Sequence, residues 1–353
     1  MCSPRSRLGD IIGGRPEALE RIVPMICYAL YRAPDNIAGG IRAIYHHVEL
    51  LEELGFDACV YCPDGRPSWF TSPAPVVTTL PPLTEHDHVV FPEGVGLAEE
   101  EALASPAVKH VFCQNQFYVF RKHQAIAERA RLGIDHVFAS TGIIAQFLES
   151  TFASLRVPVV PYVIDRAQFR PTAKEARIAY MPRKLADDAL FIEGTFKARY
   201  PDLADTPWIR LDGLEQRQVA EELGRSAVFL SLSHRESFGL PPVEAMAAGC
   251  LVVGFHGGGG LEYATPANGL WYHHDQADAV ADGLATALRA YHADAPLLHG
   301  LRERGAALAA RYDRDTCRAA LERYFTEKGA LHRPTEVAKV TGVTGLLRRL
   351  LTP

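Results

Sequence analysis

Short apolar strands and amphipathic helices alternate along this chain, and the alternation strongly limits what it can fold into. Residues 24–30 (PMICYAL) form a strand-like run, residues 41–54 place apolar side chains at helical spacing, and residues 56–63 (FDACVYCP) return to a strand. Further strand-like runs follow at 88–93, 108–114 and 135–141. Strands separated by a helix are joined in parallel through a right-handed crossover. The first half is therefore expected to form a parallel sheet covered by helices.

The same alternation starts again after Pro171. Strand-like runs occur at 177–181, 208–211, 227–233 and 251–255, with helical patterns at 185–200, 215–224 and 276–290. A chain of 353 residues exceeds one ordinary core and suggests two domains of about 150 residues each. We expect an α/β protein of two doubly wound parallel-sheet domains, joined near 169–174. Its ligand cleft would face the carboxyl ends of both sets of strands.

Composition and charge narrow the classes of function. The chain is 48% hydrophobic and 22% charged, which is normal for a globular protein. A formal net charge of -5 gives no overall attraction to a polyanion, so we expect no nucleic-acid partner. Cys59 and Cys62 form a lone CxxC without a second pair or a nearby His at zinc spacing, and we favour buried strand thiols over a redox or metal role. A reducing cytoplasm is the expected compartment.

The two ends of the chain bear on membrane contact. The first twenty residues hold no apolar stretch long enough for a signal peptide, and no run of about eighteen apolar residues occurs. Near the other end, Arg348 and Arg349 lie between two Leu pairs. Such a segment either contacts an anionic bilayer surface or packs on the protein itself, and we favour packing. We expect a cytoplasmic protein whose membrane contact, if any, is peripheral at the inner face.

The stretch HRESFGLPPVEAMAAG, residues 234–249, places two carboxylates around a double proline. The prolines suit the first turn of a helix because the amides they lack would be unpaired there, and Gly249 supplies a left-handed stop. Glu236 is thus expected on the loop that leaves the preceding strand. Glu244 is expected in the first helical turn.

The helix dipole alone favours an acid in a first turn, and this would account for Glu244 without any function. It does not account for Glu236 on the strand-exit loop, close to Gly239, which permits close backbone approach. The free amides from Phe238 to Leu240 are expected to point into the cleft, where they would bind a phosphate or a sugar hydroxyl. We therefore interpret the pair of acids as a ligand site.

Glu236-Ser-Phe-Gly-Leu240, followed by Glu244-Ala-Met-Ala247 and Gly249, resembles the signature of retaining glycosyltransferases of family four, the glycosyl transferases of group 1. Those enzymes have the GT-B fold, in which two Rossmann-like domains face each other across a cleft. Other segments fall in the order that the family shows: Ala38–Gly40, Val160–Pro171 and Gly257–Glu262. The resemblance covers roughly residues 25–325.

The resemblance implies a role for each matching residue of the motif. Glu236 would bind hydroxyls of the transferred sugar near the reacting carbon, and Glu244 would bind the ribose of the nucleotide. Four backbone amides would bind the sugar and the diphosphate, those of Ser237, Phe238, Gly239 and Leu240.

Cations and glycines complete the implied donor site. Arg183 and Lys184 would clamp the diphosphate and stabilise the charge on the leaving group, a task that fixed cations perform without a metal. Family members have Gly-Arg-Leu with a Lys several residues on. This chain shortens that segment, so Lys184 matches and Arg183 stands in for the family arginine. Gly39 and Gly40 would let the amino-terminal loop approach the diphosphate and the acceptor.

The residues that follow the strand VKHVFC depart from the family. Many relatives carry a histidine there that contacts the donor sugar, where this chain has Gln114 and Asn115. Asn115 cannot act as a general base, but it can hydrogen-bond the sugar or the acceptor. Glu93, at another strand end, either orients an acceptor hydroxyl, with Gln114 on the same side, or is a plain loop acid. His110 begins the strand and is interpreted as structural.

The resemblance implies a retaining, metal-independent transfer of a hexosyl or deoxyhexosyl group from a nucleotide-diphosphate sugar to a hydroxyl, with no cofactor besides the donor. The acceptor would be a carbohydrate or a lipid-linked saccharide of a surface polysaccharide or glycoconjugate. A GT-B sugar-nucleotide epimerase and a sugar-nucleotide-binding protein without turnover stay open as alternatives. Residues 1–170 would form the acceptor-side domain, with 1–20 flexible. Residues 171–328 would form the donor domain, and residues 329–353 a tail that packs back on the first domain.

Overall fold

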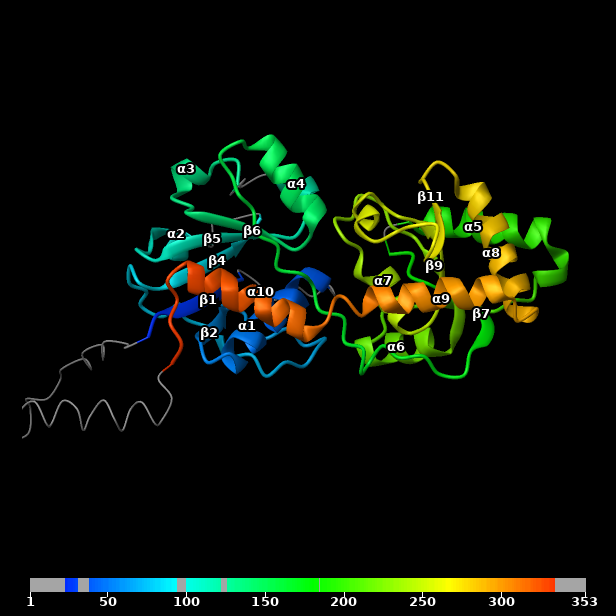
Figure 1. Cartoon of the computed structure of the whole chain (residues 1–353), viewed down its shortest axis with the longest axis horizontal. Helices are drawn as coiled ribbons and strands as arrows, with labels where there is room; N and C mark the ends of the chain where they lie inside the picture. Colours follow the sequence, from blue (N-terminus) through cyan, green and yellow to red (C-terminus); the bar gives the residue numbers. More distant parts are fainter. Residues whose placement is uncertain (1–22, 31–37, 94–99, 122–125, 184, 334–353) are drawn as a thin grey trace, which may run out of the picture.

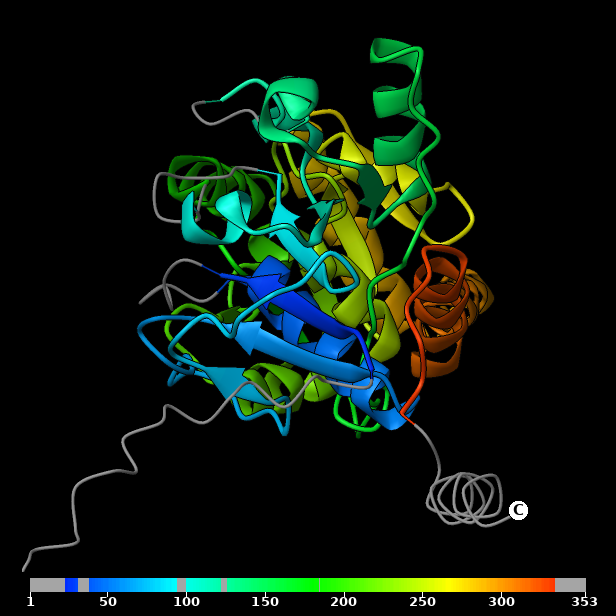
Figure 2. The same ribbon diagram turned by 90° about the vertical axis from the view of Figure 1, so that its left-hand side faces the viewer.

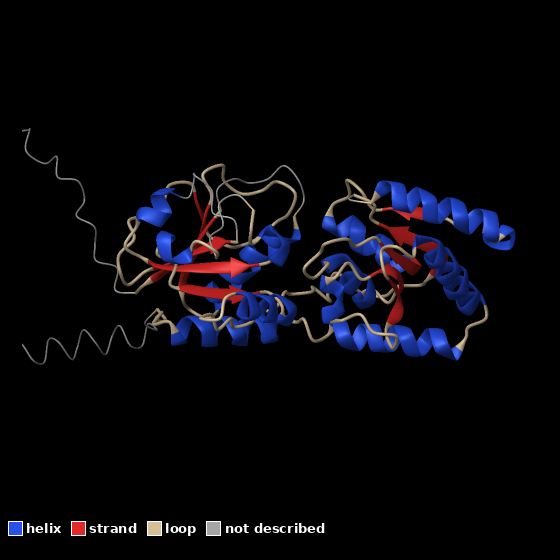
Figure 3. Ribbon diagram, turned by 90° about the horizontal axis from the view of Figure 1, so that it is seen from above, coloured by secondary structure: helices blue, strands red, loops and turns tan. Residues whose placement is uncertain are grey.

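The structure of the chain is a computed structural model that describes residues 23–30, 38–93, 100–121, 126–183 and 185–333. Two units, each built on one parallel sheet, follow each other along the long axis of the molecule (Figure 1). Helices flank both sheets when the molecule is seen from above (Figure 3). The α/β fold of two Rossmann-like domains, predicted from the alternation of strands and helices, is confirmed.

The first unit is a six-stranded sheet in the order β3-β2-β1-β4-β5-β6, and its strands pair in parallel. The strands are β1 Met25–Ala29, β2 Asp57–Tyr61, β3 Val76–Val77, β4 His88–Pro92, β5 Val108–Cys113 and β6 His136–Ala139. The helices are α1 Gly39–Glu53, α2 Glu100–Ala104, α3 Arg129–Leu132 and α4 Gly142–Thr151, with a 3-10 turn η2 at Gln116–Tyr118. The strand order reverses between β1 and β4, so a crevice forms at their carboxyl ends.

Strand β1 shows why this sheet is buried on both faces. Ile26 and Tyr28 pack into one hydrophobic core, while Cys27 and Ala29 pack into the other. Successive side chains of a strand point to opposite faces, and both faces here are apolar, as helices on two sides require. β1 therefore lies inside the sheet.

The second unit is a five-stranded parallel sheet in the order β11-β10-β9-β7-β8. The strands are β7 Glu175–Tyr180, β8 Trp208–Arg210, β9 Ser226–Ser231, β10 Leu251–Phe255 and β11 Gly269–Tyr272. The helices are α5 Ala186–Arg199, α6 Gln216–Arg225, α7 Leu240–Ala247, α8 Ala277–His292 and α9 Pro296–Ala309, with 3-10 turns η3 at Pro201–Leu203 and η4 at Gly259–Glu262. Here the strand order reverses between β7 and β9.

The chain crosses between the units twice. The first crossing, residues 157–171, pairs with the end of β6 through an isolated bridge between Ala139 and Val159. The second crossing follows α9. The two crossings touch, because the amide of Ile164 donates to the carbonyl oxygen of Tyr312 over 2.8 Å.

The last described helix, α10 Arg314–Glu327, packs against α1 on the first unit (Figure 1, Figure 2). An ion pair of 2.6 Å joins Arg314 to Glu53 at this contact. The sequence placed residues 314–327 in the donor domain, whereas they cover the domain on the other side of the cleft. Most of the tail assigned to 329–353 lies outside the described residues.

Candidate active site

Glu236 lies on the loop after β9, where the strand order of the second unit reverses. The backbone is left-handed on both sides of it, with φ of 49° at Arg235 and 81° at Gly239. The amide of Glu236 donates to the Gly257 carbonyl over 3.1 Å, and its own carbonyl accepts from the Gly259 amide over 2.7 Å. A non-glycine residue at positive φ is costly and persists where its surroundings fix it. The glycine-rich loop after β10 therefore holds Glu236 in place.

Helix α7 carries Glu244 into the same region. The helix begins at Leu240 with prolines in its first turn, and Gly249, with a φ of 78°, follows its end. Because α7 begins one residue before the double proline, Glu244 is its fifth residue and the first turn holds no acid. Placing Glu244 in the first turn was therefore wrong. The dipole acts within the first turn, so Glu244, which is 5% exposed, needs a charged or polar partner.

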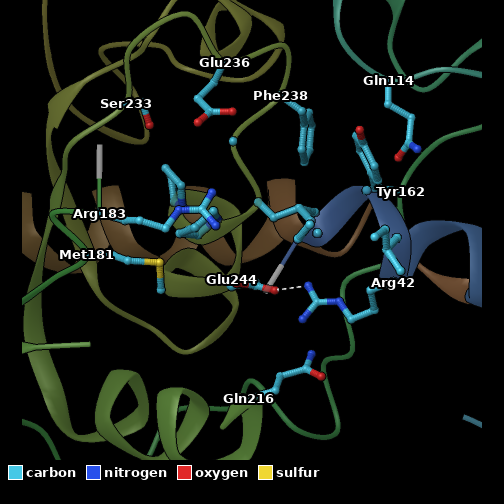
Figure 4. Close-up of a pocket in the computed structure, with 18 of the residues that line it drawn as sticks. Arg42, Gln114, Tyr162, Met181, Arg183, Gln216, Ser233, Glu236, Phe238 and Glu244 are labelled. Carbon is cyan, nitrogen blue, oxygen red and sulfur yellow. Dashed lines mark hydrogen bonds and ion pairs between the residues drawn. The ribbon is translucent and has the colours of Figure 1, made fainter. Parts of the chain in front are cut away.

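All the described residues that the sequence assigned to the site line one cleft of about 550 Å³ (Figure 4). The first unit contributes Gly39, Gly40, Glu93, Gln114 and Asn115, and the second contributes Arg183, Glu236, Ser237, Phe238, Gly239, Leu240 and Glu244. Arg183 follows β7 and reaches inward between Glu236 and Glu244 (Figure 4). Lys184 lies outside the described residues. The residues are brought together, while the roles given to them stay predictions.

Phe238 has a structural task that the sequence did not indicate. Its side chain is 2% exposed, and its ring centroid lies 5.0 Å from that of Tyr162, 5.1 Å from Tyr263 and 4.9 Å from Tyr312. Tyr162 and Tyr312 belong to the two crossings. The ring therefore anchors the Glu236 loop where the two units join.

Gly39 and Gly40 begin α1 and pack closely on their neighbours. A Cβ at Gly39 would lie 2.5 Å from Cδ1 of Leu240, and a Cβ at Gly40 would lie 3.1 Å from Oε1 of Gln114. The first of these contacts joins the two units. Gly39 thus sets how closely α1 approaches α7, and Gly40 sets how closely α1 approaches Gln114.

The polar residues of the first unit surround the opposite crevice. Asn115 accepts a hydrogen bond from the Phe117 amide over 3.0 Å and so caps η2. Glu93, 8% exposed, follows β4 and accepts from the Gln114 amide over 3.1 Å. Burial raises the pKa of the Glu93 carboxyl to about 7, and the bond from Gln114 opposes part of this rise. A carboxyl group that titrates near neutrality can exchange hydrogen bonds with an acceptor hydroxyl.

Arg42 is the main site residue that sequence reasoning missed. It lies in the first turn of α1, and its Nη2 is 2.5 Å from Oε1 of Glu244 across the cleft (Figure 4). A cation in a first turn is disfavoured by the helix dipole, and this misfit is the signal that could have identified it. Tyr162, Met181 and Gln216 are among the other lining residues that were not predicted.

Three properties of the described part of the chain bear on metal binding, membrane contact and thiol chemistry. Within it, no group of three or more His, Cys, Asp or Glu side chains is arranged to hold a metal ion. None of the described helices is long and apolar enough to cross a membrane. The described cysteines, Cys59 and Cys62 among them, are buried and form no disulfide.

The two parallel sheets face each other across a cleft, and carboxylates and a cation lie where one strand order reverses. This arrangement defines a protein of the GT-B class. Residues 211–306 match the family model described as "Glycosyl transferases group 1". The match confirms the resemblance predicted from the motif at 234–249 and supports glycosyltransferase activity.

Individual relatives agree with this class. An "Alpha-1,6-glucosyltransferase" of Actinobacillus pleuropneumoniae serotype 7 (strain AP76) is 24% identical over 233 residues, which are 62% of this chain and 69% of the relative. The solved sucrose-phosphate synthase of Thermosynechococcus elongatus has a TM-score of 0.63 at 13% identity, covering 86% of this chain and 98% of the other. Anabaena HepE in complex with UDP-glucose has a TM-score of 0.61 at 11% identity, covering 86% and 99%. At these identities the solved structures show a shared fold.

Proposed function

We propose that the protein is a retaining glycosyltransferase that moves a hexosyl group from a nucleoside-diphosphate sugar to a hydroxyl acceptor. The observation that carries the proposal is the convergence of Glu236, Glu244 and Arg183 at the β7/β9 reversal. This wall of the cleft faces the β1/β4 reversal of the first unit. Both walls are places where α/β sheets bind ligands.

Each of these residues has a different role in the proposed donor site. Glu244 accepts hydrogen bonds from ribose hydroxyls, Glu236 binds hydroxyls of the sugar, and Arg183 stabilises the diphosphate as negative charge grows on it. Arg183 and the amino-terminal end of α7 provide fixed positive charge, which supports a metal-independent reaction without a cofactor beyond the donor.

The proposed reaction takes place on one face of the sugar. The bond from the anomeric carbon to the phosphate oxygen breaks while a bond to the acceptor oxygen forms on the same face. The acceptor proton passes to the departing phosphate oxygen. Such a step needs no protein base, and it therefore accommodates Asn115 where relatives have a histidine. Closure of the two units would exclude water and limit hydrolysis of the donor.

UDP-glucose is the donor that we propose to test first, because the Anabaena relative is solved with it and the Actinobacillus relative is named a glucosyltransferase. The acceptor would be a carbohydrate or a lipid-linked saccharide of a surface polysaccharide or glycoconjugate. Among the described residues the buried cysteines form no disulfide, which supports a reducing cytoplasm as the compartment. Any membrane contact of the protein would be peripheral, at the inner face.

Incubation of the full chain with radiolabelled UDP-, GDP- and dTDP-glucose tests the proposal. We expect slow release of free glucose and nucleoside diphosphate, faster release with a saccharide acceptor, and NMR of the product showing the anomeric configuration of the donor. An inverted product contradicts retention. An epimerised sugar nucleotide, or tight binding without any product, contradicts transfer.

Substitution of the two acids tests the site itself. Glu236→Ala should lower kcat by about 100-fold or more, while Glu244→Ala should mainly raise the KM for the donor, by about tenfold. Glu221→Ala removes an exposed acid of α6 and serves as the matched control. Unchanged kinetics in both site variants would overturn the assignment.

A further inference from the structure

Arg42 and Glu244 form an ion pair between the two units inside the cleft. Nη2 and Oε1 lie 2.5 Å apart, and the two side chains are 12% and 6% exposed (Figure 4). A pair so shielded from water stabilises a protein little unless further hydrogen bonds satisfy both groups. The pair therefore calls for a functional explanation.

The position of Arg42 in α1 offers no stabilising reason for an arginine. The first turn of α1 holds no acid. At Ala38, the residue before this turn, no side chain of the described residues caps the helix. The positive end of the helix and the guanidinium therefore repel each other. The start of α7 faces the start of α1, because Leu240 contacts Gly39. Two positive helix ends and Arg42 thus meet at one place, which favours an anion there.

Arg42 also retains hydrogen-bonding capacity at this place. A guanidinium has five N–H donors in a planar fork, and among the described residues one bond from Arg42 is seen, to Glu244. This fork matches phosphate oxygens. Glu244 holds the fork in the cleft on the side of α7, where the diphosphate would lie.

We propose that Arg42 is a donor-site residue supplied by the first unit, which binds the diphosphate of the nucleotide sugar while Glu244 fixes its guanidinium. This inference rests on the proposed function, because it requires a nucleoside-diphosphate donor. Arg42 and α7 belong to different units, so the contact forms when the units are closed. Donor binding would consequently stabilise the closed arrangement. Arg42 would also let the site discriminate a nucleoside diphosphate from a nucleoside.

Isothermal titration with the full chain tests this role. UDP, GDP, ADP and dTDP are titrated first, and the tightest ligand is then compared with its own nucleoside. In Arg42→Ala we expect the affinity for the diphosphate to fall about 10- to 100-fold, as for loss of a charge-assisted contact. The affinity for the nucleoside should change less than about threefold. Arg42→Lys keeps the charge beside Glu244, so it serves as a second variant in case Arg42→Ala misfolds. It should show a smaller loss of affinity for the diphosphate.

Arg314→Ala is the matched control, because it removes an ion pair that α1 makes outside the cleft, and it should leave both affinities unchanged. An equal loss of affinity for the diphosphate and the nucleoside in Arg42→Ala would mean that Arg42 only positions Glu244, and it would overturn the inference. A gain in diphosphate affinity would make Arg42 a competitor of the donor and also overturn it. If the unaltered protein binds none of the four diphosphates, the proposed function itself fails.

Discussion

The hydroxyl of Tyr263 donates a hydrogen bond to the backbone carbonyl oxygen of Gly239 over 3.0 Å. Gly239 has a φ of 81°, and a Cβ there would lie 3.2 Å from the Tyr263 hydroxyl oxygen. The bond thus fixes the left-handed turn that joins Glu236 to α7. Tyr263 positions the two carboxylates relative to each other without contacting a ligand.

Tyr263→Phe removes this bond while keeping the ring. We expect kcat to fall about fivefold and the free energy of unfolding to fall by about 1 kcal/mol, since one neutral hydrogen bond is lost. Steady-state kinetics and urea unfolding measure the two effects. Tyr291→Phe is the matched control, because Tyr291 donates to the Lys174 carbonyl over 2.6 Å in the second unit. It should lose similar stability with unchanged kcat, and an equal fall of kcat in both variants would contradict the positioning role.

The fold and the carboxylate pair could be predicted because both depend on local patterns. Alternating strands and helices specify parallel sheets, and the motif that holds Glu236 and Glu244 lies within a single short stretch. By contrast, Arg42 and Glu244 are 202 residues apart, and their contact depends on how two separate units face each other. No local pattern encodes that orientation.

Other misses have similar physical causes. β3 spans two residues, Val76–Val77, and is too short to show strand alternation. The residues of α10 have helical character, but which unit they cover depends on the second crossing. Phe238 lies within the recognised motif, yet its burial comes from aromatic rings of distant segments.

Glu262 forms a further link between the units. Its carboxylate accepts from the Gly142 amide over 3.1 Å and the Ile143 amide over 3.0 Å, at the start of α4. A carboxylate at this end is favoured by the helix dipole. Glu262→Gln removes the charge and faces a donor group toward amides, so we expect the closed arrangement to weaken and the donor KM to rise about three- to tenfold.

Small-angle X-ray scattering should show a larger radius of gyration for Glu262→Gln than for the unaltered protein. Glu149→Gln provides the comparison, because Glu149 accepts from the Val157 amide over 2.8 Å within the first unit. That variant should keep both the dimensions and the KM. Identical scattering from all three proteins would show that Glu262 does not hold the units together.

Glu93 should make stability fall as pH rises. Burial raises the pKa of this carboxyl to about 7, so between the ordinary pKa near 4.5 and 7 the folded state keeps a proton that the unfolded state releases. The contribution is present below about pH 4.5 and is lost by about pH 7, a change of about 3 kcal/mol at most. Glu93→Gln should remove this loss and be more stable, relative to the unaltered protein, at pH 8 than at pH 5. Urea unfolding at both pH values measures this change in relative stability. The same change in the exposed variant Glu85→Gln would refute the role of Glu93.

The buried histidines that pack against α10 should make stability fall as the pH drops. Nδ1 of His110 lies 2.8 Å from the Tyr324 hydroxyl, and Nδ1 of His88 lies 3.0 Å from Nε2 of His110. Burial lowers the pKa of His88 to about 4 and that of His110 well below its ordinary value, and nearby His136 lowers both further. Asp87 opposes the shift at His88.

Below about pH 6.5 the unfolded chain binds protons at His88 and His110 that the folded chain does not bind. Stability therefore falls as the pH drops toward 4. For His88 this loss is about 3 kcal/mol at most. His110→Gln keeps hydrogen-bonding groups but cannot become charged, so we expect a shallower loss of unfolding free energy between pH 6.5 and 4.5. His299→Gln, at an exposed position on α9, is the matched control for the loss of a histidine. Hydrogen exchange should show α10 losing protection first on acidification, because Tyr324 bonds directly to His110. Equal slopes in all three proteins would contradict a role for the buried histidines.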